Sequence, residues 1–128
     1  MRAIVIDDSR AMRLILRRIV GQLGFETIEA EDGRAALDTL NAEADLPDLA
    51  LVDWNMPNMN GLEFVTRARA DPRLREMTLV MVTTESEQGQ IVRALAAGAH
   101  EYVIKPFTEG AMIEKLALLG LVPSGVNS

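Results

Sequence analysis

The sequence predicts an α/β fold in which a doubly wound parallel sheet is covered by helices on both faces. Two observations support this prediction. Five short apolar runs alternate with longer segments in which apolar residues recur every three or four positions, the spacing of one face of a helix. Such alternation is typical of parallel strands that are joined by right-handed helical crossovers.

Length and composition fit one globular domain. The chain has 128 residues, of which 48% are hydrophobic and 25% charged, and it has no cysteine for disulfides or thiolate metal sites. The first apolar run, 3–6, ends at two aspartates and does not form a signal peptide, and no apolar stretch is long enough to span a membrane. A net charge of −6 argues against non-specific binding to nucleic acid. We therefore expect a cytoplasmic protein that acts on neither membranes nor nucleic acids.

The first half of the chain is predicted to contain three strands and two helices. Residues 3–6 form a buried strand, and Ser9 is a suitable N-cap for the helix that follows and ends at Gly24. Residues 25–30 alternate between apolar and polar, which indicates an edge strand, and Asp32-Gly33 leads into a shorter helix. The third strand is 49–53. The first helix is expected to bury Met12, Ile15, Leu16, Ile19, Val20 and Leu23, and to expose Arg10, Arg13, Arg17 and Arg18.

The second half continues the pattern. A helix from Gly61 to Asp71-Pro72 buries Leu62, Val65 and Ala68, and the continuously apolar strand 78–83 is expected to be covered on both faces. A helix over 86–97, a strand over 101–105 and a last helix complete the domain, which we place at 1–122 with a short polar tail at 123–128. The last helix is expected to carry Met112, Ile113, Leu116, Ala117 and Leu119.

Polar residues follow four of the predicted strands at their carboxyl ends. In open parallel sheets ligands bind at this edge. Three carboxylates would repel one another without a cation, and oxygen ligands on an open site suit Mg²⁺. A lysine supplies a point charge for a phosphoryl oxygen, and an aspartate beside a metal can act as a nucleophile that forms an acyl phosphate. The residues concerned are Asp7 and Asp8 after strand 1, Asp53 at the end of strand 3, Thr83 at the end of strand 4 and Lys105 at the end of strand 5.

Each of these residues also has an ordinary interpretation when it is taken alone. Asp7-Asp8 is compatible with an acidic helix N-terminus, and Lys105 with a solvated surface lysine. Thr83 is compatible with a plain strand residue, and Tyr102 with a half-buried aromatic side chain. Only two of the 13 basic residues are lysines, however, and all these polar groups converge on one edge. The convergence favours a functional site.

With these motifs in place, the chain resembles the receiver domain of two-component response regulators, most closely its single-domain chemotaxis type. The resemblance covers essentially the whole chain. It implies a flavodoxin-like (βα)5 fold with strand order 2-1-3-4-5. The motifs are Asp7-Asp8, Asp53-Trp-Asn-Met-Pro-Asn-Met-Asn-Gly61, Thr83-Thr84, Ala97-Gly98-Ala99 before Tyr102, and Lys105-Pro106-Phe107.

The resemblance also implies a role for each site residue. Asp53 would accept a phosphoryl group from a histidine kinase, and Lys105 would contact that group. Thr83, Tyr102 and Lys105, with Pro106 after a cis peptide bond, would form the switch. Mg²⁺ would be bound directly by Asp8 and Asp53, by the backbone carbonyl of Asn55, and by Asp7 through water. Asn55 and Glu85, which flank the site, would tune the lifetime of the phosphoryl group.

The output and the competing functions follow from the same resemblance. The fourth helix, fifth strand and fifth helix of a monomer would change their binding of a protein target, which is either a flagellar motor switch or, in a phosphorelay, a histidine phosphotransfer protein. A separate phosphatase is a possible further partner. An aspartyl-phosphate phosphatase needs a second aspartate two residues after the nucleophile, where this chain has Asn55. A nucleotide-binding domain lacks support because neither glycine-rich phosphate motif is present.

Overall fold

The central element is a parallel sheet of five strands. A computed structural model describes residues 1–121 and gives the strand order β2-β1-β3-β4-β5. This confirms the flavodoxin-like α/β fold. The strands are β1 (Arg2–Ile6), β2 (Glu26–Ala30), β3 (Leu49–Val52), β4 (Thr78–Thr83) and β5 (Glu101–Ile104).

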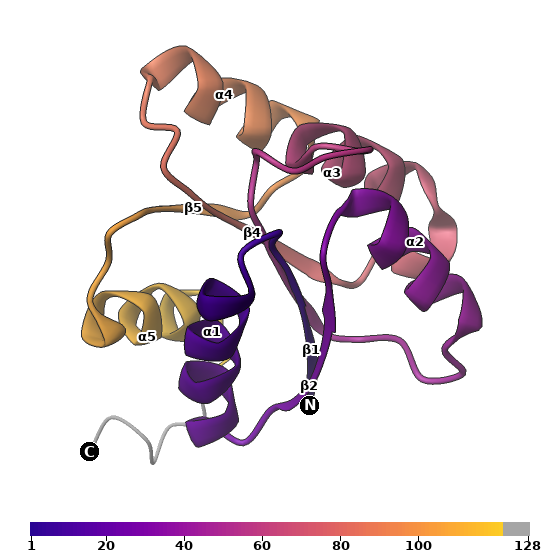
Figure 1. Ribbon diagram of the computed structural model, residues 1–128, viewed down its shortest axis with the longest axis horizontal. Coiled ribbons are helices and arrows are strands. Elements are labelled where there is room, and N and C mark those ends of the chain that lie inside the picture. Colours follow the sequence, from indigo (N-terminus) through magenta and orange to yellow (C-terminus); the bar gives the residue numbers. More distant parts are fainter. Residues whose placement is uncertain (122–128) are drawn as a thin grey trace.

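Five helices cover the sheet in two layers (Figure 1). On one face, α1 (Arg10–Gln22) and α5 (Glu109–Leu118) pack against a core that includes Leu16, Val20, Met112 and Leu116. On the other face lie α2 (Gly33–Ala42), α3 (Gly61–Ala70) and α4 (Gln88–Ala97), whose core contains the fully buried Phe64. A short 3-10 helix, η1 (Pro72–Leu74), follows α3. Within residues 1–121 no helix is long and apolar enough to cross a membrane.

The strands end where the sequence places the polar residues. β3 and β5 are each one residue shorter than predicted, so Asp53 and Lys105 lie just beyond them. Their backbones still continue the pairing, because the N–H of Asp53 donates to the carbonyl of Ile6 at 2.9 Å and that of Lys105 to the carbonyl of Thr83 at 2.9 Å. The side chains are thereby delivered to the carboxyl edge of the sheet. The strand β4 matches the prediction, and β2 is an edge strand as expected.

Four local predictions need correction. The helix α4 begins at Gln88 and not at Ser86, because the residues before it are held in contacts with the pocket that are described below. Ile15 is 45% exposed because it lies at the margin of the apolar stripe of α1. Arg13, predicted to face solvent, has a side chain that is only 14% exposed. The helix α3 buries Phe64 more completely than the predicted Leu62. Residue 122 and the predicted tail at 123–128 lie outside the described residues.

Candidate functional site

An acidic cluster occupies the carboxyl edge of the sheet. Asp7 follows β1 and Asp53 follows β3, and these strands are neighbours in the sheet with Ile6 paired to Val52. One carboxylate oxygen from each of Asp7, Asp8 and Asp53 lies within 4.8 Å of the others. Asp7 is 1% exposed and Asp53 8%, while Asp8 is exposed. The three acids that the sequence predicted to converge therefore do so.

Asp7 is the most firmly held of the three. Its N–H donates to the carbonyl of Ala30 at 3.1 Å. Its carboxylate accepts from the N–H of Ser9 at 2.8 Å and from the Lys105 ammonium at 2.8 Å. Every polar atom of the residue thus has a defined neighbour, because Arg13 binds its carbonyl.

Lys105 reaches into the same cluster from the end of β5. Its Nζ lies 3.5 Å from the Asp53 carboxylate, and its side chain is 12% exposed. The Lys105–Pro106 peptide bond is cis, as predicted. Lys105 is therefore not a solvated surface lysine but a cation set between two of the acids.

The negative charge of the cluster is not fully neutralised by the protein, which favours binding of a cation. Burial raises the pKa of Asp53, and the neighbouring charge of Asp7 acts in the same direction, whereas the Thr83 hydroxyl and the charge of Lys105 oppose them. A single ammonium faces three carboxylates. Three hard oxygen donors, of which one is exposed, fit a divalent cation that keeps part of its water shell.

The opposite wall of the pocket joins the predicted switch residues through Glu85. The buried Tyr102 donates its hydroxyl to the backbone carbonyl of Glu85 at 2.7 Å, and the Glu85 carboxylate accepts from the side-chain amide of Asn55 at 2.6 Å. The hydroxyl of the fully buried Thr83 accepts from the N–H of Glu85 at 3.4 Å. Burial raises the pKa of Tyr102, and the charges of Glu85 and Asp53 add to the effect. Glu85 thus connects Asn55 beyond β3, Thr83 of β4 and Tyr102 of β5.

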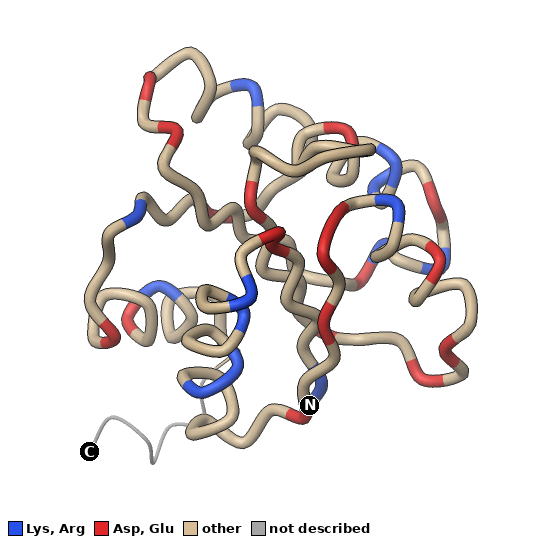
Figure 2. Tube along the Cα trace, in the orientation of Figure 1, with Lys and Arg blue, Asp and Glu red and all other residues tan. Residues whose placement is uncertain are grey.

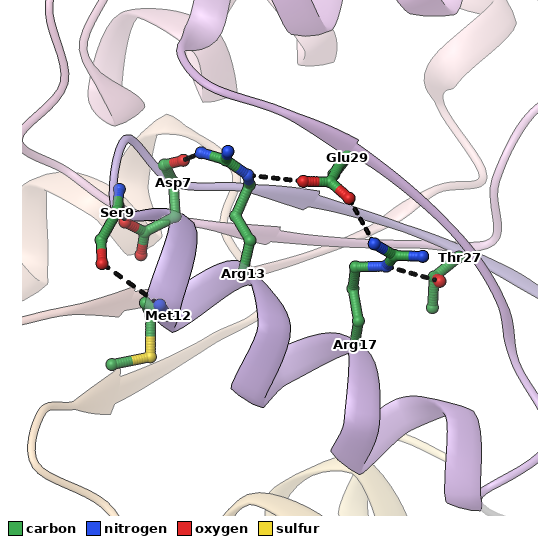
Figure 3. A network of polar contacts seen from close by, with 7 residues as sticks. All are labelled: Asp7, Ser9, Met12, Arg13, Arg17, Thr27 and Glu29. Carbon is green, nitrogen blue, oxygen red and sulfur yellow. Dashed lines mark hydrogen bonds and ion pairs between the residues drawn. The ribbon is translucent and has the colours of Figure 1, made fainter.

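Two arginines beside the pocket make contacts that were not predicted. Arg13 donates to the carbonyl of Asp7 at 2.6 Å and to Glu29 at 2.7 Å (Figure 3). Arg93 of α4 lies over the ring of Trp54, with its guanidinium carbon 5.9 Å from the ring centroid. Helical spacing puts Arg13 on the polar side of its helix, and no pattern in the sequence brings Glu29 to it, since the contact joins α1 to β2.

Comparison with known proteins gives one consistent answer. The family model of the response regulator receiver domain matches residues 3–117. The chain is 43% identical over 120 residues to chemotaxis protein CheY1 of Helicobacter pylori strain J99, covering 93% of this chain and 96% of that protein. It is 40% identical over 117 residues to chemotaxis protein CheY of Pseudomonas aeruginosa, covering 91% of this chain and 93% of that protein.

Solved structures agree with the sequence comparison. The chemotaxis response regulator CheY4 of Vibrio cholerae superimposes with a TM-score of 0.84 at 29% identity, covering 92% of this chain and 97% of that one. The chain therefore belongs to the response regulator receiver domain family, as a phosphoacceptor domain and not a classical enzyme.

Proposed function

We propose that this receiver domain is a chemotaxis switch in which Asp53 accepts the phosphoryl group of a histidine kinase. The observation that carries the proposal is the placement of Asp53, a mostly buried carboxylate between an acidic pair and Lys105. The relatives named above are chemotaxis proteins, which supports that pathway. We expect the domain to work in the cytoplasm as a monomer.

The chain's own residues supply most of the chemistry. An oxygen of Asp53 attacks phosphorus in line, a P–O bond forms, and the P–N bond to the kinase histidine breaks as the imidazole leaves with its electron pair and takes up a proton. Asp8 and Asp53 would bind Mg²⁺ directly, the carbonyl of Asn55 would complete the set, and Asp7 would act through water. Bound Mg²⁺ supplies charge neutralisation at the phosphoryl oxygens. Lys105 moves from the Asp53 carboxylate to a phosphoryl oxygen.

The modification is detected on the opposite wall of the pocket. A phosphoryl oxygen on Asp53 offers the Thr83 hydroxyl a strong charged acceptor. Reorientation of Thr83 would loosen its contact with the N–H of Glu85, to whose carbonyl the Tyr102 hydroxyl is bonded. The phosphorylated state is favoured only by contacts that differ between the two states, and Thr83, Tyr102 and Lys105 are the residues able to make them.

The output surface lies on α4, β5 and α5. Each of these elements carries at least one large apolar side chain that is exposed. A motor switch protein is the expected target. A phosphorelay in which a histidine phosphotransfer protein receives the phosphoryl group is the second candidate. The exposed side chains are Val92 and Leu95 of α4, Ile104 of β5 and Leu118 of α5.

Asn55 and Glu85 are proposed to set the lifetime of the phosphorylated state. They are hydrogen bonded to each other at 2.6 Å beside Asp53. A water molecule that attacks phosphorus in line must pass this region. Removing either side chain is expected to change the dephosphorylation rate without preventing phosphorylation.

The first experiment is phosphorylation by acetyl phosphate with Mg²⁺, followed by intact mass. The wild-type protein should gain one phosphoryl group, and Asp53→Asn none; the same adduct on Asp53→Asn would overturn the assignment. Lys105→Arg should still be phosphorylated but should give a weaker change in the chemical shifts of α4.

Asp8→Ala should weaken Mg²⁺ binding more than Asp7→Ala, and the opposite order would refute the proposed ligand roles.

A second experiment separates the two pathways. The protein is immobilised with and without beryllofluoride, a mimic of the acyl phosphate, and exposed to cytoplasmic extract. Selective retention of a motor switch protein with beryllofluoride supports the chemotaxis role. Retention of a histidine phosphotransfer protein, and phosphoryl transfer to it, would instead establish the relay.

A further inference from the structure

The peptide group between Asp7 and Asp8 is held by a side chain from the next helix. The carbonyl of this peptide belongs to Asp7 and accepts from Nη1 of Arg13 at 2.6 Å (Figure 3). Arg13 lies on α1, one helical turn beyond the N-cap Ser9, and its side chain is only 14% exposed. Arginine side chains are mostly exposed in proteins, so an arginine that is largely covered and binds one backbone carbonyl and one acid is an uncommon arrangement.

Asp8 depends on this peptide group more than Asp7 does. The Asp7 carboxylate is fixed by its own contacts with Ser9 and Lys105. The Asp8 carboxylate is exposed and has no hydrogen-bond partner within residues 1–121. The position of Asp8 relative to the other two acids is therefore set by its backbone, which begins at the peptide that Arg13 holds.

Arg13 is itself braced by the edge strand. Its Nε donates to Glu29 of β2 at 2.7 Å, and the second carboxylate oxygen of Glu29 pairs with Arg17, one turn further along α1. Arg17 also donates to the hydroxyl of Thr27 at 3.1 Å. The hydrogen bond from Arg13 lowers the pKa of Glu29, so the brace stays ionised at neutral pH. Figure 3 shows these contacts as one connected series from Asp7 to Thr27.

We infer that Arg13, braced by Glu29, is a positioning residue for the metal site: it holds the Asp7–Asp8 peptide so that the Asp8 carboxylate faces the cluster before a cation arrives. This inference rests on the proposed function, because it assigns Asp8 as a direct ligand. Groups that orient metal ligands without touching the metal commonly change its affinity by about ten- to a hundredfold. Arg13 would do this through the backbone.

Charge and positioning predict opposite signs for the loss of Arg13. A guanidinium near the three acids repels a divalent cation, so its removal should tighten Mg²⁺ binding if only its charge matters. If Arg13 positions Asp8, its removal should weaken Mg²⁺ binding despite the lost repulsion. Arg18 provides the matched control, because it is an exposed arginine of the same helix that makes no hydrogen bond or ion pair within the described residues. Figure 2 shows the basic positions that follow one another along α1.

The test compares Mg²⁺ binding by wild type, Arg13→Met, Glu29→Gln and Arg18→Met. Titration calorimetry gives the Kd, and the emission of Trp54, the single tryptophan and the neighbour of Asp53, follows the same titration. We expect the Kd to rise about tenfold in Arg13→Met, about threefold in Glu29→Gln, and not at all in Arg18→Met. An Arg13→Met variant that binds Mg²⁺ as tightly as Arg18→Met, or more tightly, would overturn the inference.

Phosphorylation distinguishes a weakened metal site from a damaged pocket. With acetyl phosphate, Arg13→Met should need more Mg²⁺ for half-maximal labelling but should approach the wild-type rate at saturating Mg²⁺. A rate that stays low at every Mg²⁺ concentration would count against a positioning role. If Arg13→Met does not fold, Glu29→Gln decides alone: an unchanged Kd would overturn the inference. A wild-type protein that binds Mg²⁺ but is not labelled at Asp53 would refute the proposed function and leave the Arg13 test intact.

Discussion

The two flanks of the acidic pocket are built differently. At the β1–α1 flank, the hydroxyl of Ser9 accepts from the N–H of Met12 at 3.2 Å, and Arg13 ties the loop to β2. At the β4–α4 flank, Glu87 occupies the N-cap position of α4 but makes no side-chain capping hydrogen bond. The helix α1 buries Leu16, Ile19 and Val20, whereas α4 buries only Ala94.

The difference separates the two tasks of a phosphorylation switch. A metal site works best when its ligands are fixed before the cation arrives, so that binding does not have to order them. A switch element must instead have a second arrangement close in free energy, and such elements have few buried apolar contacts. The β1–α1 flank has the properties of a preformed metal site, and the β4–α4 flank has those of a switch element.

The largest effect is expected between the two flanks, at the start of α3, which follows the central strand β3. A Cβ on Gly61 would lie 2.2 Å from the carbonyl oxygen of Asp53 and 2.9 Å from its carbonyl carbon, and these backbone atoms cannot move without moving Asp53. Gly61→Ala should lower the free energy of unfolding by about 3 kcal/mol, measured by urea denaturation. Gly110→Ala in α5 is the control, because its Cβ would meet nothing within 4 Å. Equal urea midpoints for Gly61→Ala and wild type would show that this loop adapts.

The second effect concerns the cap of α1. Ser9→Ala removes the acceptor for the N–H of Met12 and should lower the free energy of unfolding by about 1 kcal/mol. Ser9→Asp keeps an acceptor at the same position and should restore most of the loss. If Ser9→Ala has no effect, the flank is held by Arg13 and the apolar core alone.

The strand ends explain how much of the site was predictable. Asp53 and Lys105 follow apolar runs, and parallel strands bring their carboxyl ends to one edge, so the acidic cluster follows from the sequence pattern. The contact between Arg13 and Glu29 does not follow from the sequence pattern, because it depends on which residue of β2 lies beside α1. Periodicity assigns a residue to a face of its own helix and says nothing of the next strand.

The start of α4 shows why tertiary contacts can override a local signal. The sequence favours a helix over 86–97, which would begin at Ser86. The segment before Gln88 is instead held by Glu85, whose carbonyl accepts from Tyr102 and whose carboxylate accepts from Asn55. These partners are 17 and 30 residues away along the chain, so no local pattern reveals them.

The third prediction concerns the missing side-chain cap of α4, at the β4–α4 flank. Glu87 has the extended backbone of an N-cap, with φ −69° and ψ 136°, and a shorter carboxylate there can reach a free N–H of the first turn. Glu87→Asp should therefore raise the free energy of unfolding by about 0.5 kcal/mol, again by urea denaturation. Glu109→Asp is the matched control, because α5 already has a cap in Thr108. An equal increase in the free energy of unfolding in both variants would show that the gain in Glu87→Asp does not come from capping α4.

The smallest effect is expected from pH, at the far end of the same flank. The Nδ1 atom of His100, which lies between α4 and β5, accepts from the N–H of Leu79 at 3.0 Å and so requires a neutral imidazole. Partial burial, assisted by the charge of Arg69, lowers the pKa of His100 below the ordinary histidine value of 6.5. The folded state therefore binds this proton less readily than the unfolded state, and the contribution of His100 is complete above pH 6.5 and is lost as the pH falls toward the folded pKa. In His100→Asn, an amide oxygen replaces the acceptor and nothing titrates. As the pH falls from 7.5 to 5.5, the free energy of unfolding, measured by urea denaturation, should decrease more for wild type than for His100→Asn. An equal decrease in both proteins would show that protonation of the imidazole does not cost the hydrogen bond from the N–H of Leu79.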